Sequence, residues 1–256
     1  MLASDSMAPN DCSDKDKGLR LRIRPNKDCS IPLYEGQPTP KAHTETKPSP
    51  SMNLIPLLSL FFAALVLIWS GIQPADRFTW WLEIAPALIV LPILLATYKK
   101  FRLTNMLYIL IALHAAILMV GGHYTYALVP IGQWLGDVFN THRNSYDGIG
   151  HLAQGFVPAL VLRELLLRTS PLRQGKWLNF IIIFCCLGVS ASYELVEWIV
   201  SIETGDGADA FLGTQGDIWD TQKDMALAGV GAIAAIILCS KIHDRAMQRA
   251  GFQISP

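Results

Sequence analysis

The chain has 256 residues, of which 51% are hydrophobic and 16% are charged, with 21 basic and 21 acidic side chains. A net charge of zero gives no electrostatic signature of nucleic-acid binding, so no nucleic-acid partner is expected. This length suits one or two soluble domains or one polytopic membrane protein, and the high hydrophobic share favours the membrane protein.

Residues 1–52 are polar, rich in Pro, Lys, Asp and Ser, and without an apolar period, which predicts a disordered tail. No apolar run follows the basic residues of this segment before Leu54, so it does not have the pattern of a signal peptide. Met52 stands directly before the first apolar run, which makes the tail a candidate upstream extension of a shorter natural start.

Six apolar segments follow, each close to the roughly 20 residues that a helix needs to cross the hydrocarbon core. They lie at 54–72, 82–98, 103–121, 148–167, 177–202 and 220–241. The second is short and contains Pro86 and Pro92, so a kink or tilt is expected there. The pattern predicts an all-α transmembrane bundle over 53–245, followed by a short C-terminal tail at 246–256.

The distribution of Lys and Arg predicts the orientation of these spans, because cytoplasmic loops carry an excess of both. The tail is basic, and so are the second loop, the fourth loop and the C-terminal end of the chain. The first loop has only Arg77, the third only Arg143, and residues 202–219 have none. Both termini are therefore expected in the cytoplasm, with the third and fifth loops facing outward.

Polar side chains gather at the outer ends of the last three spans. The fourth span carries Asp147, His151 and Gln154, the fifth carries Glu194 and Glu197, and the sixth begins with Asp217, Asp220 and Asp224. Spacings of three, four and seven residues place each set on one helix face. Isolated charges cost about 2.5–3.5 kcal/mol in a bilayer, so these groups are expected to pair or to line a cavity.

Five or more carboxylates at one depth need protons, a cation or basic partners. The candidate partners are His151, Arg143 and Lys223, with His142 and His123 as weaker ones. Local explanations also exist: Asp147, Asp217 and Asp220 suit helix N-termini, Glu197 beside Trp198 suits an interfacial anchor, and His151, Glu194 and Asp224 suit buried interhelical hydrogen bonds. Their common depth favours one convergent, outward-facing polar site.

Three blocks of sequence resemble the YjdF-type proteins, a bacterial inner-membrane family of unknown function. The blocks are RNSYDGIGHLAQGFVPALVLRELLLR at 143–168, SYELVEW at 192–198 and FLGTQGDIWDTQKDMALAGVGA at 211–232. The resemblance covers about residues 52–256 and implies a multi-pass protein of the bacterial inner membrane. A more distant similarity connects Glu194, Asp224 and Gly231 with VanZ-like membrane proteins, although Ala228 stands where that pattern has Asn. It implies a lipid-related ligand.

Three functions remain open at this stage. The first is a non-enzymatic protein of the lipid bilayer that binds a lipid headgroup, a cation or a small polar ligand at the polar site. The second is a metal-dependent intramembrane hydrolase or transferase on a lipid-linked substrate, with a divalent cation held by His151, Glu194, Asp220 and Asp224. The third is a proton-coupled transporter. The sequence does not decide whether the protein is an enzyme, and it indicates no oligomeric state.

Overall fold

The computed structural model describes residues 54–141, 143–204 and 215–252, and this part of the chain is helical, with turns and loops and no strand. The expected tail at 1–52 lies outside the described residues. The helices are α1 (Leu54–Ser70), α2 (Arg77–Thr97), α3 (Asn105–Tyr124), α4 (Pro130–Phe139), α5 (Tyr146–Thr169), α6 (Lys176–Thr204) and α8 (Asp220–Arg249).

Helices α1, α2, α3, α5, α6 and α8 correspond to the six expected spans. By length and composition, α2, α3, α6 and α8 are long and apolar enough to cross a membrane. Helix α1 is apolar but has only 17 residues. Helix α5 is long enough but carries charged residues in both its first and its last turns. The fold is a helical membrane bundle.

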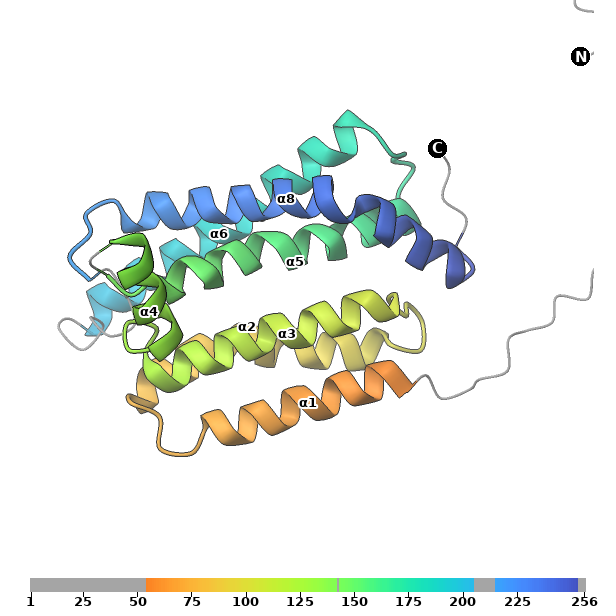
Figure 1. Cartoon of the computed structure of the whole chain (residues 1–256). Helices are drawn as coiled ribbons and strands as arrows, with labels where there is room; N and C mark the ends of the chain where they lie inside the picture. The colour runs from red at the N-terminus through yellow and green to blue at the C-terminus, as the bar shows by residue number, and fades with distance from the viewer. Residues whose placement is uncertain (1–53, 142, 205–214, 253–256) are drawn as a thin grey trace, which may run out of the picture. The chain divides into compact units, whose positions relative to one another are not determined.

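Figure 1 shows α1, α2 and α3 as one group of helices and α5, α6 and α8 as another, with the short α4 at one end of the bundle. Helix α3 packs against α1 and α2, while α5, α6 and α8 pack against one another, with α5 and α8 in the most extensive contact. Helix α3 also packs against α5 and so joins the two groups. The C-terminal ends of α3 and α6 and the N-terminal ends of α2, α5 and α8 meet at one end of the bundle, which we call the polar end.

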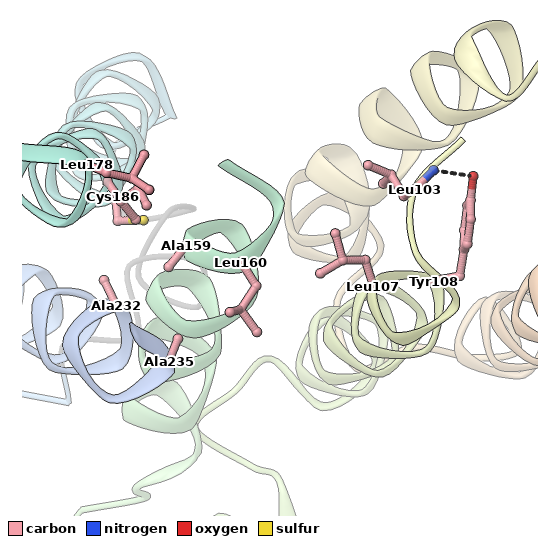
Figure 2. Packing of buried hydrophobic residues seen from close by; sticks show 10 residues of the cluster. Leu103, Leu107, Tyr108, Ala159, Leu160, Leu178, Cys186, Ala232 and Ala235 are labelled. Atoms are coloured by element: carbon pink, nitrogen blue, oxygen red, sulfur yellow. Dashed lines mark hydrogen bonds between the residues drawn. The ribbon is translucent and has the colours of Figure 1, made fainter. Parts of the chain in front are cut away.

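The core lies where α3, α5, α6 and α8 meet, away from the polar end (Figure 2). Leu160 of α5 lies toward Leu107 of α3, whereas Ala159 of α5 and Ala232 of α8 lie toward α6. The buried members are Leu103, Leu107, Tyr108, Ala159, Leu160, Leu178, Ile182, Cys186, Ala232 and Ala235. Many large apolar side chains elsewhere on α1, α2 and α6 are exposed, which is the arrangement expected where the solvent is lipid rather than water.

Two helices extend well beyond the expected spans, and one helix was not expected. Helix α2 begins at Arg77, because the Asp76 side chain accepts a hydrogen bond from the backbone N–H of Thr79 (2.6 Å) and caps the helix. Helix α8 continues to Arg249, past the expected boundary at 245. Helix α4 was not expected, since ten residues are too few to span a bilayer.

A buried polar network lies at the end of the bundle opposite to the polar end. The carboxylate of Glu164 accepts hydrogen bonds from the backbone N–H of Thr104 (3.0 Å) and from Arg168 (2.6 Å), and it lies 3.0 Å from His243 Nε2. Arg163 forms an ion pair of 2.7 Å with Asp244. These contacts tie the start of α3 to α5 and α8, and they place Arg163 and Glu164 in pairs with neighbouring helices.

Candidate functional site

Helices α5 and α8 approach each other closely because glycines remove side chains from their interface. A Cβ atom at Gly155 would overlap the carbonyl oxygen of Ala228, and one at Gly231 would overlap the carbonyl oxygen of Leu152. Small residues allow such backbone contact in membrane bundles. The close packing brings the polar face of α5 to that of α8.

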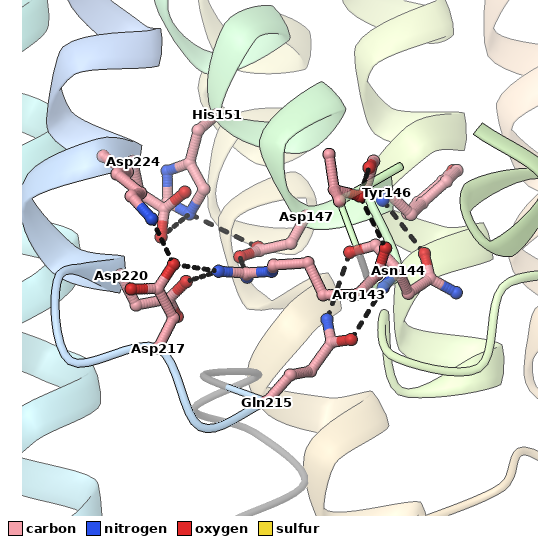
Figure 3. A network of polar contacts seen from close by, with 12 residues as sticks. Arg143, Asn144, Tyr146, Asp147, His151, Gln215, Asp217, Asp220 and Asp224 are labelled. Atoms are coloured by element: carbon pink, nitrogen blue, oxygen red, sulfur yellow. Dashed lines mark hydrogen bonds and ion pairs between the residues drawn. The ribbon is translucent and has the colours of Figure 1, made fainter. Parts of the chain in front are cut away.

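Arg143, in the loop before α5, is the centre of an ion-pair network at the polar end (Figure 3). Its guanidinium nitrogen Nη1 lies 2.5 Å from Asp220 Oδ1 and 3.1 Å from Asp217 Oδ2. Its Nη2 lies 3.7 Å from Asp147 Oδ2, and Lys223 Nζ lies 2.5 Å from Asp217 Oδ2. Two of the expected basic partners therefore hold Asp217 and Asp220.

The ion pairs shift the pKa values of the groups in the loops. Burial opposes the charge of Arg143, but the hydrogen bond and the negative charge of Asp220 outweigh it, so the pKa of Arg143 is raised. The hydrogen bond from Lys223, followed by that from the Trp219 backbone N–H, lowers the pKa of Asp217. Both groups are charged at neutral pH.

Asn144 fixes the loop that carries Arg143. Its side-chain amide donates to the carbonyl oxygens of Ala127 (3.0 Å) and Val129 (2.8 Å), and its Oδ1 accepts from the backbone N–H of Tyr146 (3.0 Å). The side chain of Gln215 exchanges two hydrogen bonds with the Asn144 backbone, at 2.8 and 3.1 Å. The segment before α8 is thereby joined to the segment before α5, as Figure 3 shows.

The imidazole of His151 lies among carboxylates from three helices. Its Nε2 is 3.5 Å from Asp147 Oδ1, 3.9 Å from Glu194 Oε1 and 3.9 Å from Asp224 Oδ2. Its Nδ1 is 2.8 Å from Gln154 Oε1. Because Oε1 is an acceptor, Nδ1 is the donor, which leaves Nε2 facing only carboxylate oxygens.

Among the described residues, Asp147, His151 and Asp224 form a group that could hold a metal ion, with one ligand atom from each lying within 4.8 Å of the others. Glu194 adds a fourth group: its side chain is buried, and its Oε1 has no hydrogen-bond partner. Asp220, which was expected among the metal ligands, instead forms an ion pair with Arg143. Asp147 takes its place beside His151.

A cavity of about 400 Å³ adjoins this group between α2, α3, α5 and α6. Its polar part, at the polar end, is lined by Glu83, Tyr126, Asp147, His151, Gln154, Tyr193 and Glu197. Its other part is lined by apolar residues that include Ile93, Leu94, Ile111, Pro158 and Val161, with His114 as a polar exception. Asp147 and His151 thus face the cavity, whereas Glu194 and Asp224 do not line it.

Glu83 is the polar-end residue that sequence reasoning missed. It lies in α2, is 5% exposed, and accepts a hydrogen bond from Tyr193 Oη (3.4 Å) across the cavity. A carboxylate inside an apolar span was the available signal, because such residues are rarely without a partner or a role.

The remaining expectations have mixed outcomes. The structure brings Gln154 and Glu197 to the cavity beside His151. His123 does not join the site, because its Nδ1 lies 2.9 Å from the backbone oxygen of Ser70. His142 and the acidic segment at 205–214 lie outside the described residues.

The family model described as a predicted membrane protein (DUF2238) matches residues 55–245 of the chain. The chain belongs to this family. It is also 49% identical to the inner membrane protein YjdF of Escherichia coli (strain K12) over 191 residues, which are 73% of this chain and 90% of that relative. The chain is therefore an integral protein of the bacterial inner membrane. No solved structure matches it. These comparisons add no support for the VanZ-like similarity, which stays a prediction.

Proposed function

We propose that this inner-membrane protein binds a divalent cation at its polar end, through His151, Asp147 and Asp224, with Glu194 as a further ligand. The observation that carries the proposal is the surrounding of His151 Nε2 by three carboxylate oxygens at 3.5–3.9 Å. With Nδ1 donating to Gln154, a neutral imidazole would direct its lone pair at these oxygens. That arrangement is repulsive unless a positive charge lies between them.

A cation supplies that charge with suitable geometry. Protein ligand atoms lie about 2.0–2.2 Å from a divalent ion, which places neighbouring ligand atoms roughly 3.0–3.4 Å apart. The distances from His151 Nε2 to the three carboxylates exceed this by about half an ångström, and the ligand atoms of Asp147, His151 and Asp224 lie within 4.8 Å of one another. Side-chain rotations that draw these atoms together would complete the site. A hydrogen bond on the second ring nitrogen, as from His151 to Gln154, is the usual support of a metal-bound imidazole.

The composition of the group favours Mn²⁺ or Mg²⁺. Carboxylate oxygens are the ligands that both ions prefer, and a single imidazole is better suited to Mn²⁺ than to Mg²⁺. A protonated imidazole is the competing source of positive charge. Its single Nε2–H could serve Asp147, the nearest carboxylate at 3.5 Å, and the buried Glu194 Oε1 would stay without a donor.

Elemental analysis of the detergent-purified protein tests this proposal. The wild type, incubated with MnCl₂ and passed through a desalting column, should retain about one ion per chain. Asp224→Asn and His151→Ala should lose it. Asp217→Asn is the matched control, because Asp217 belongs to the same polar end but is paired with Arg143 and Lys223. A wild type without a bound ion, or equal retention in all four proteins, would refute the proposal.

One observation supports a metal-dependent hydrolase or transferase as a second candidate. Asp147 and His151 line the cavity, so a cation held there would have an open coordination position on that side. Such a position is where an activated water or a substrate binds in metalloenzymes. Proton-coupled transport has less support, because the apolar part of the cavity has only His114 as a titratable group among its described lining.

A further inference from the structure

The cavity between α2, α3, α5 and α6 has an amphipathic lining. Its polar part is formed by carboxyl and hydroxyl groups, and its apolar part continues between the same helices. At about 400 Å³ it lies within the range of roughly 300–1,000 Å³ that is typical of small-molecule sites. A ligand that fills it must have a polar head and an apolar chain.

The charge of the polar part selects the head. Glu83, Glu197 and Asp147 line it, and no Lys or Arg is among its described lining residues. Arg143 and Lys223 are already engaged by Asp217 and Asp220. A primary ammonium group can donate three hydrogen bonds, and it matches a set of carboxylate and phenol oxygens. A head with negative charge and no ammonium group would meet these three acidic side chains without a Lys or Arg beside them.

The polar part is held in place by close backbone packing. A Cβ atom at Gly122 would lie 3.0 Å from the Cβ of Glu83, and one at Gly150 would lie 3.0 Å from the ring of Tyr126. Tyr126 and the preceding Thr125 both have positive φ angles, of 46° and 58°. Left-handed backbone in such residues is costly and often occurs at functional sites. The turn after α3 thereby directs Tyr126 to Glu83.

The cavity also reaches the surface that faces the bilayer. Val90 and Ile93 of α2 and Val189 of α6 line it and are 40%, 55% and 49% exposed. These residues lie in spans, so what meets them is lipid rather than water. An occupant can therefore enter laterally from the membrane.

From this we infer that the cavity binds one bilayer phospholipid with a primary ammonium headgroup. The ammonium lies among Glu83, Glu197 and the hydroxyls of Tyr126 and Tyr193, and an acyl chain lies along Ile111 and Val161. The phosphate of the same lipid lies toward Asp147 and His151, and this last part rests on the proposed cation, which would offset its charge.

Native mass spectrometry of delipidated protein tests this inference, with three phospholipids of identical acyl chains as probes. The ethanolamine lipid should bind about tenfold more tightly than the choline and glycerol lipids. Glu83→Gln/Glu197→Gln should reduce this preference to less than about threefold. Glu203→Gln, an exposed glutamate at the end of the same helix as Glu197, should leave it unchanged. Equal binding of the three lipids, or a preference that survives in the double variant, would overturn the inference.

Two further variants keep the test decisive if the double variant does not fold. Val189→Trp should obstruct the opening and weaken ethanolamine-lipid binding about tenfold, whereas Val196→Trp, on an exposed position of α6 outside the cavity, should not. Unchanged binding in Val189→Trp would contradict lateral access to this cavity.

Asp224→Asn separates the two proposals: the ethanolamine preference should persist in it even though the cation is lost. If the wild type retains no cation but still prefers the ethanolamine lipid, only the proposed function is refuted.

Discussion

At the scale of single residues, the acids of the polar end have two kinds of partner. Asp217 and Asp220 are bound by the permanent charges of Arg143 and Lys223. For Asp224 and Glu194 the neighbouring basic group is instead the imidazole of His151, at 3.9 Å from each. The first pair needs no further ligand, which is why the cation is assigned to the second pair and to Asp147.

The pH dependence of stability should report the pairing of Asp217. Its pKa is lowered in the folded state by Lys223, so its stabilising effect is present above the unfolded pKa of about 3.9 and is lost as the pH falls through the folded value. The difference in unfolding temperature between wild type and Asp217→Asn should be constant above about pH 5 and should shrink below about pH 4. Intrinsic tryptophan fluorescence in detergent measures it.

The control for this titration is Glu203→Gln, which removes an exposed carboxylate at the C-terminal end of α6. The difference in unfolding temperature between this variant and the wild type should not show the pH dependence that is expected for Asp217→Asn. A wild-type advantage over Asp217→Asn that stays constant down to about pH 3 would show that the pair with Lys223 does not form.

At the scale of helices, the contact between α5 and α8 determines whether the site can exist. The i, i+4 spacing of Asp147 and His151, and of Asp220 and Asp224, was readable from the sequence, as was the small-residue character of α8. Gly155 was not assigned to that contact, because one glycine in a helix does not indicate which neighbour it faces. The structure places it against the backbone of Ala228.

Gly155→Ala should therefore destabilise the protein strongly, although it adds only one methyl group. The added methyl group would meet the carbonyl oxygen of Ala228 and force α5 and α8 apart, at a cost of about 1–3 kcal/mol, and it should also weaken retention of the cation. Gly188→Ala on α6 is the matched control, since a Cβ there meets nothing within 4 Å. Thermal unfolding and elemental analysis of both variants measure these effects. Equal stability of the two variants would argue against the α5–α8 contact.

At the scale of the whole molecule, the bundle separates two polar regions by an apolar middle. The polar end contains the candidate site, and the opposite end contains the buried network of Glu164, Arg168 and His243. The excess of Lys and Arg in the loops and termini near the Glu164 network predicts that this end of the bundle faces the cytoplasm. The polar end is then expected to face the outer side of the inner membrane.

Topology reporters test that orientation. A green fluorescent protein fused after the C-terminal residue Pro256 should fluoresce, because the C-terminus is expected in the cytoplasm. Alkaline phosphatase fused after Phe139, in the loop that contains α4, should be active, because the enzyme needs the oxidising outer compartment. The reverse pair of results would place the polar end in the cytoplasm and would move the candidate cation site to that side.

The sequence by itself determined the number and approximate extent of the apolar segments, their expected orientation and the face of each helix that is polar. These properties depend on transfer free energy and on periodicity within one segment, so they need no knowledge of neighbours. Only the tertiary structure decided which acids meet which bases. Arg143 binds Asp220, Asp147 joins His151, and Glu83 of α2 enters the cavity, because helix rotation and backbone approach at Gly155, Gly231 and Gly122 bring these side chains together.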